Sequence, residues 1–161
     1  MTDLHLNTKD GASASPADVV GMLEGSVATA SGLLGLMSKE TSFDQIKLQS
    51  YVQSFLAANL TFASAFEIAE ALPLIAPPNT RLSQSDAERI QSLIQGLDRT
   101  YLMQTFLEMK SATEKFKKAG EFLEQEEYDK SASSLKGAVS EFRKGVKIYI
   151  KARKISWGMD L

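Results

Sequence analysis

The sequence contains no cysteine and only one histidine, His5. Without cysteine, the chain can form no disulfide, no thiolate metal site and no cysteine nucleophile. The Glu-x-x-His pairs that hold di-iron centres inside helical bundles need more than one histidine. The composition therefore argues against a metalloenzyme, and no cofactor is expected.

An excess of one sign of charge is also missing. The net charge is −2, and 43% apolar and 24% charged residues are ordinary values for a soluble globular protein. A chain of 161 residues is expected to form one domain with a substantial core. We predict a flexible polar tail over residues 1–16 and a single helical domain over residues 17–157.

No secretory signal is recognised near the first residue, because Asp3 occupies the place of a basic region and no apolar run follows it. A cytoplasmic location is therefore expected. Export by a route that uses no cleaved signal stays open.

Apolar side chains recur at alternating steps of four and three residues near the C-terminus. This spacing places them on one stripe of an α-helix over residues 128–155, which neighbouring helices must cover. Residues 17–38, 42–72 and 83–124 repeat this coiled-coil-like period, and no strand pattern competes with it. We predict an all-α fold, an antiparallel four-helix bundle with long helices and a C-terminal helical hairpin. The stripe of the last helix consists of Tyr128, Ala132, Leu135, Val139, Phe142, Val146 and Tyr149.

Helix starts are marked by capping residues. Ser15 is a preferred N-cap residue, and Pro16 follows it at the first helical position. Ser42 is expected to cap the second helix, and Ser83 or Ser85 the third.

The apolar stripe of the third helix shifts by one residue near Gly96 and Asp98. Either the helix bends there or its buried face rotates. A continuous helix would be about 60 Å long, which is longer than any of its partners. Part of its apolar face would then be free for another chain, including a second copy of itself.

The polar corner at residues 125–127 is short, so the third and fourth helices are expected to be antiparallel neighbours. The simplest register brings opposite charges together at four places, and each exposed pair would add about 0.2–1 kcal/mol. The expected pairs are Glu108 with Arg143, Lys110 with Glu141, Glu114 with Lys136, and Asp98 with Arg153.

Five residues of this hairpin have types found in tetratricopeptide repeats: Gly120, Tyr128, Ala132, Leu135 and Ala138. Residues 118–142 therefore resemble one helical pair of that family. Such repeats need about three copies to be stable, and the sequence has no second copy. The resemblance supports only the antiparallel hairpin.

A line of small residues runs along the first helix, beside its apolar stripe. Such a line lets another backbone approach closely, and each glycine weakens the helix by about 1 kcal/mol relative to alanine. Close packing inside a soluble bundle is favoured over a membrane-spanning helix, because Glu24 and several hydroxyl residues interrupt the apolar run. The line consists of Gly21, Gly25, Ala28, Gly32 and Gly35.

Two short patterns could in principle support catalysis. Ser133 and Lys136 have the S-x-x-K spacing of some acyl-transfer enzymes, but the motifs that accompany it in those enzymes are missing. Glu67 and Glu70 lie one helical turn apart, as in acid–base or magnesium sites. Solvated helix faces explain both patterns better, so no catalytic residue is assigned and the protein is not expected to be an enzyme.

Basic residues gather near the C-terminus, where residues 130–155 contain eight basic side chains and one acid, Glu141. This cluster could bind an acidic protein or an anionic membrane. Nucleic acid is not expected, because no aromatic residues alternate with the basic ones to stack on bases. The competing interpretation is a solvated face with the tryptophan packed as an anchor. The candidate partner-binding residues are Arg143, Lys144, Lys147, Lys151, Arg153, Lys154 and Trp157.

These observations favour a non-enzymatic helical interaction module, such as an adaptor, a chaperone-like binder or an assembly subunit. Its expected partner is another protein or a second copy of the chain. The alternative is a membrane-active helical protein that uses the glycine-rich first helix and the basic last helix, and a membrane surface ranks below a protein partner.

Overall fold

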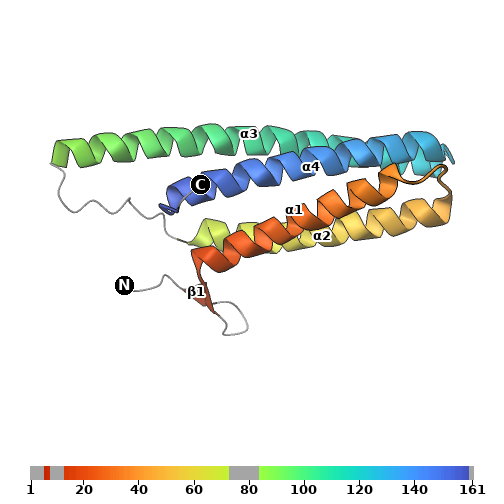
Figure 1. Ribbon diagram of the computed structural model, residues 1–161. Coiled ribbons are helices and arrows are strands. Elements are labelled where there is room, and N and C mark those ends of the chain that lie inside the picture. The colour runs from red at the N-terminus through yellow and green to blue at the C-terminus, as the bar shows by residue number, and fades with distance from the viewer. Residues whose placement is uncertain (1–5, 8–12, 73–83, 160–161) are drawn as a thin grey trace.

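The computed structural model describes residues 6–7, 13–72 and 84–159, and the prediction of an all-α antiparallel bundle with a C-terminal helical hairpin is confirmed (Figure 1). Four long helices make up the bundle, and two very short strands precede them. In order, the elements are β1 (Leu6–Asn7), β2 (Ser13–Ala14), α1 (Pro16–Ser38), α2 (Gln45–Ala71), α3 (Gln84–Glu124) and α4 (Tyr128–Ser156).

The start of α1 follows the sequence prediction. The Ser15 hydroxyl accepts a hydrogen bond from the Asp18 backbone N–H at 3.2 Å, and the Ser15 N–H donates to the Asp18 carboxylate at 3.1 Å. Together these bonds satisfy two N–H groups that the helix itself leaves unpaired.

The predicted N-cap of α2 was wrong. Asp44, not Ser42, caps this helix, and its carboxylate accepts a hydrogen bond from the Lys47 N–H at 2.8 Å. Both residue types cap helices well, but the negative charge of aspartate is also stabilised at the positive end of the helix dipole.

Helix α3 is continuous from Gln84 to Glu124, so the helix is not interrupted at Gly96. The Thr100 hydroxyl donates to the Gly96 carbonyl at 3.0 Å and reinforces the helix there. Ser85 lies inside the helix and is not its cap, whereas Ser83 lies outside the described residues.

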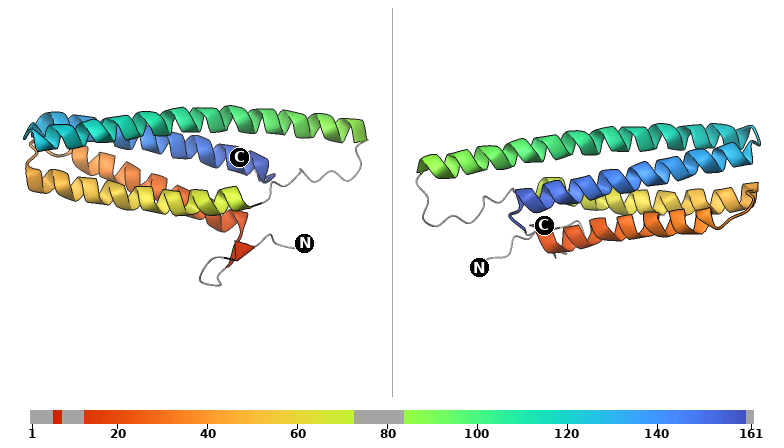
Figure 2. Two further views of the ribbon diagram at one scale, coloured as in Figure 1. Left: turned by 180° about the vertical axis from the view of Figure 1, so that it is seen from behind. Right: turned by 45° about the horizontal axis from the view of Figure 1, so that its top comes forward.

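Helix α4 occupies the middle of the bundle. It packs along α3 on one side and against α1 on the other, and it also touches α2. Helices α1 and α2 pack together, but the backbones of α2 and α3 hardly approach each other (Figure 2). The first turns of α3 extend beyond the end of α4 (Figure 1).

The predicted register of the α3–α4 hairpin agrees with the structure to within about one residue at the Ser131 and Lys151 contacts and to within two to three residues at Gly145. The Ser131 hydroxyl donates to the Ala119 carbonyl at 2.7 Å, and the Lys151 ammonium lies 5.4 Å from the centre of the Tyr101 ring. Gly145 allows the close contact between the helices, because an added Cβ would lie only 2.9 Å from the Met109 sulfur.

Three of the charge pairs predicted from that register do not form among the described side chains, namely Glu108 with Arg143, Lys110 with Glu141, and Glu114 with Lys136. The pair of Asp98 with Arg153 stays a prediction. Glu141 binds Lys115 at 3.0 Å, and Arg153 binds Glu70 of α2 at 2.9 Å. Register fixes the height of a residue along the helix but not the side to which its side chain points. The Asp98 side chain lies outside the described residues.

The core is built on aromatic rings from α2 and α4. The Phe142 ring meets the Phe55 and Phe62 rings edge to face, with centroids 5.4 and 5.6 Å apart. The Tyr149 ring meets the Phe62 ring in the same way at 6.1 Å. Such edge contacts place the positive ring edge on the negative ring face, which adds stability beyond the burial of area.

A short antiparallel pairing lies within the stretch predicted as a flexible tail. Leu6 pairs with Ala14 and Asn7 with Ser13, and Ala14 is buried in the core. Because Ala14 immediately precedes the N-cap of α1, the pairing fixes how the chain enters the bundle. Residues 13–16 therefore belong to the folded unit.

The small-residue line of α1 faces outward, so the interpretation of close packing inside the bundle was wrong. All five positions are exposed, and an added Cβ would meet nothing within 4 Å at any of the four glycines. Among the described helices, α1 is the one whose length and composition would suffice to cross a membrane. Its most apolar window has a mean hydropathy of 1.4, and 39% of that window is buried in the bundle.

Candidate functional site

An open groove lies where the backbones of α2 and α3 stay apart. It has a volume of about 440 Å³ and is lined almost entirely by apolar side chains. Clefts of this size with a few polar groups are typical of binding sites. The lining residues are Phe62, Ala63, Phe66 and Glu70 of α2 and Leu102, Thr105, Phe106 and Met109 of α3.

The floor of the groove is fixed by aromatic contacts. The Phe66 ring packs on the Tyr149 ring of α4 at 5.0 Å between centroids, and Phe62 packs against Phe142. At the far end, the Phe55 and Phe116 rings meet at 5.3 Å and close the gap between α2 and α3. The groove is thus held open by a packed floor and is not a loose gap.

The upper parts of both walls are exposed. Phe106 is 65% exposed and Phe66 37% exposed, although both side chains are large and apolar. Thr105 is buried, and its hydroxyl donates to the Tyr101 carbonyl of its own helix at 2.8 Å. An exposed cluster of aromatic and aliphatic side chains is characteristic of protein-binding surfaces.

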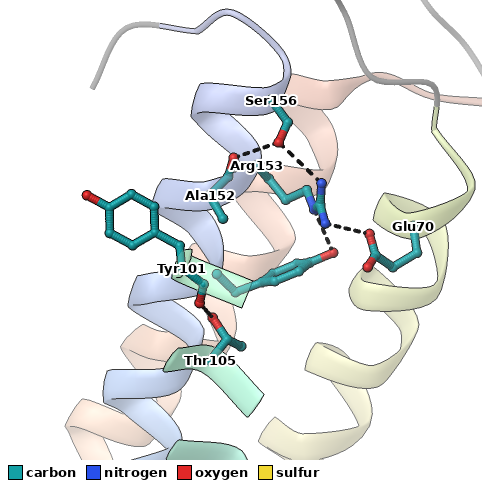
Figure 3. A network of polar contacts seen from close by, with 7 residues as sticks. Glu70, Tyr101, Thr105, Ala152, Arg153 and Ser156 are labelled. Atoms are coloured by element: carbon teal, nitrogen blue, oxygen red, sulfur yellow. Dashed lines mark hydrogen bonds and ion pairs between the residues drawn. The ribbon is translucent and has the colours of Figure 1, made fainter. Parts of the chain in front are cut away.

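The polar end of the groove is a network centred on Arg153 (Figure 3). Its guanidinium binds the Glu70 carboxylate at 2.9 Å and donates from Nε to the Tyr149 hydroxyl at 3.1 Å. It also donates to the Ser156 hydroxyl at 3.3 Å, which itself donates to the Ala152 carbonyl. The network therefore ties the C-terminal end of α4 to α2.

Burial raises the pKa of Tyr149 well above its ordinary value, and the neighbouring Arg153 only partly opposes this effect. The phenol therefore stays neutral at physiological pH. Its oxygen accepts the hydrogen bond from Arg153, and its ring forms part of the floor beneath Phe66.

The two edges of the groove carry opposite charge. Glu67 and Glu70 are exposed on the α2 side, and Arg99, Lys110 and Lys117 are exposed on the α3 side. The structure gives no ion pair between these two edges among the described residues. The groove is therefore apolar along its length, acidic on one edge and basic on the other.

The basic cluster predicted from the sequence is divided by the fold. Lys144, Lys147 and Lys151 are exposed on the outer face of α4, while Arg143 and Lys154 are half-buried. The three exposed lysines recur at steps of three and four, so they lie on one line of the helix. They lie on α4, apart from the residues that line the groove.

Arg153 and Trp157 do not belong to an exposed basic face, which corrects the sequence interpretation. Arg153 is 3% exposed because Glu70 and Tyr149 supply it with partners, and Trp157 is 3% exposed within the core. The burial of Trp157 matches the competing interpretation, in which the ring packs as an anchor. The Trp157 and Arg143 Nε atoms are buried without a hydrogen-bond partner among the described residues.

The catalytic patterns are not brought together into a reactive site. Ser133 is exposed, and the Lys136 ammonium lies over the Phe43 ring at 5.2 Å from its centre. Glu70 binds Arg153, and Glu67 is exposed one turn away. In the described part of the chain, no three His, Asp or Glu side chains are grouped so that they could hold a metal ion.

No protein-family model matches the chain, and no curated protein or solved structure is significantly similar to it.

The sequence contained part of the signal for the groove. Leu102, Phe106 and Met109 recur at steps of four and three and form an apolar stripe of α3, and surplus apolar surface on α3 was expected from its length. The sequence did not show that α2 would form the other wall. That arrangement depends on α4 standing between the helices, which no local pattern encodes.

Proposed function

We propose that the protein is a soluble, non-enzymatic interaction module of the cytoplasm, and that the α2–α3 groove is its docking surface. The observation that carries this proposal is the apolar groove of about 440 Å³ with a rigid aromatic floor. Amphipathic helices bind such grooves by inserting apolar side chains spaced three and four residues apart.

Several features support docking over catalysis. Phe66 and Phe106 are the kind of large side chains that dominate binding energy at protein interfaces. The floor beneath them is packed, so binding requires little reorganisation of the groove. The opposite charges of the two edges would fix the direction in which a partner helix lies.

Site-specific photo-crosslinking tests this function. A photoreactive phenylalanine analogue replaces Phe106 in one sample and Ile46 in a control sample. Ile46 is 79% exposed and lies at the start of α2, outside the groove. Discrete crosslinked products from position 106 and not from position 46 are expected, with the site of attachment on an apolar helical segment identified by mass spectrometry. Equal products at both positions, or none at 106, would contradict the proposal.

A membrane-active function is the second candidate, favoured by the exposed small-residue face of α1 and the exposed lysines of α4. A helix with an open glycine line can pair with another helix in a bilayer, and lysines attract anionic headgroups. Flotation with phosphatidylserine vesicles at low salt tests it. Co-flotation that is lost in Lys144→Glu/Lys147→Glu/Lys151→Glu supports this candidate, and absence of flotation eliminates it.

A further inference from the structure

We infer that the α2–α3 groove is covered by a second copy of the chain, and that the two copies meet through the same α2–α3 face. The two copies would be related by a twofold axis that runs parallel to the helices, so that α2 of each copy lies against α3 of the other. This inference rests on the docking role proposed above and names the partner.

The outer edges of α2 and α3 have matching patterns. Arg99, Met103, Phe106 and Lys110 recur at steps of four, three and four, and therefore share the outer edge of α3. The same spacing places Leu56, Leu60, Ala63 and Glu67 along the outer edge of α2. The α3 edge is apolar in its middle and basic at both ends, whereas the α2 edge is apolar from Leu56 to Ala63 and ends in the acidic Glu67.

Charge complementarity selects this twofold axis. The Phe55 ring lies against the Phe116 ring, and α2 and α3 are antiparallel. Counting along both helices from this contact brings Glu70 level with Tyr101. Arg99 lies about two residues beyond that height along α3.

Because an axis parallel to the helices preserves height, Arg99 of each copy comes within one turn of Glu70 and about one and a half turns of Glu67 in the other. Glu70 also binds Arg153 of its own copy, so Glu67 is the edge carboxylate that can be exchanged without disturbing the fold. Rotation about a perpendicular axis would instead place the basic edges of α3 on each other.

The apolar surfaces also complement each other. Phe106 rises from the groove with 65% of its surface exposed and, at the same height, meets Ala63 and Phe66 of the second copy. Met103, which is 61% exposed, is covered by the same contact. Because both copies use the same surface, the dimer buries two Phe106 side chains and two Met103 side chains.

The available area suits a reversible dimer. The face from Leu56 to Glu70 and from Arg99 to Phe116 is about 25 Å long and about 20 Å wide, or about 500 Å² in projection. The accessible area of interlocking side chains exceeds the projected area and approaches the about 800 Å² per partner of a standard interface. A dissociation constant in the micromolar range is therefore expected.

Sedimentation equilibrium of the full chain and its variants tests the inference. The native chain should change from monomer to dimer as its concentration rises from about 1 to about 300 µM. Phe106→Glu should raise the dissociation constant at least about tenfold, because every dimer loses two anchors. Ile46→Glu, the same change on an exposed residue outside the groove, should leave it unaltered.

A charge-reversal cycle tests the orientation. Arg99→Glu and Glu67→Arg should each weaken the dimer, and the variant with both changes should recover most of the native affinity, because unlike charges again face each other. Both residues are exposed, so circular dichroism should show a native fold in every variant. A native chain that stays monomeric, or a double variant weaker than both single ones, would overturn the inference.

The outcomes also separate this inference from the docking function. A photo-crosslink from position 106 to a different protein, with a monomeric native chain, would overturn the second copy as occupant and leave the docking role standing. Loss of both the crosslink and the dimer would overturn both.

Discussion

At the scale of single residues, Arg153 connects folding and the groove. Its guanidinium is buried, and Glu70 at the groove edge supplies its opposite charge. A buried charge is tolerated only when its partners satisfy it, so removal of one partner leaves a desolvated cation. The sequence analysis placed Arg153 in the basic cluster and paired it with Asp98 of α3, because periodicity does not reveal that a carboxylate of α2, Glu70, also meets this cation.

Glu70→Ala tests this dependence. We expect a loss of about 2 kcal/mol in the free energy of unfolding, because the Arg153 guanidinium loses its charged hydrogen-bond partner. Glu67→Ala, one turn away and exposed, is the matched control and should change stability by less than about 0.5 kcal/mol. Urea unfolding at a few micromolar protein measures both. Equal effects of the two substitutions would show that Glu70 does not support Arg153.

At the scale of helices, glycine has opposite roles in α1 and α4. The α1 glycines face open space, so they weaken their helix without gaining a contact. Gly145 of α4 lies against Glu108 and Met109, where it allows α3 to approach. Replacement by alanine is therefore expected to have opposite effects on stability at the α1 glycines and at Gly145.

Gly32→Ala should stabilise the protein by up to about 1 kcal/mol, since the new methyl group meets nothing within 4 Å and alanine favours the helix. Gly145→Ala should destabilise it by about 1 kcal/mol, because displacing Met109 and Glu108 outweighs the gain in helix propensity. Thermal unfolding followed by circular dichroism compares the pair. A stabilising Gly145→Ala would mean that the α3–α4 contact yields easily.

The helices themselves could be predicted because their signals are local. The periodicity of the apolar stripes predicted all four helices, and Ser15 predicted the start of α1. The short polar corner at residues 125–127 predicted the approximate register of the hairpin. The outward direction of the α1 glycine line could not be predicted, since a small residue suits a tight contact and an exposed surface equally. The groove depends on how far α2 and α3 stand apart, which is set by packing on α4.

At the scale of the whole molecule, stability should be unequal along α3. Helix α4 ends at Ser156, which lies level with about residue 96 because Lys151 lies against Tyr101. Residues 84–95 therefore extend beyond the helix against which the rest of α3 packs (Figure 1). Helical hydrogen bonds with no neighbouring helix beside them open readily, whereas the middle of α4 is covered by three other helices.

Hydrogen exchange followed by mass spectrometry tests this gradient. Amides of residues 84–95 should exchange at least about a hundredfold faster than those of residues 135–149 at low protein concentration. Because dimerisation through the groove covers only the later part of α3, raising the concentration should slow exchange at residues 99–110 and leave residues 84–95 unchanged. Protection that rises first at residues 84–95 would instead assign self-association to the overhanging end of α3 and not to the groove.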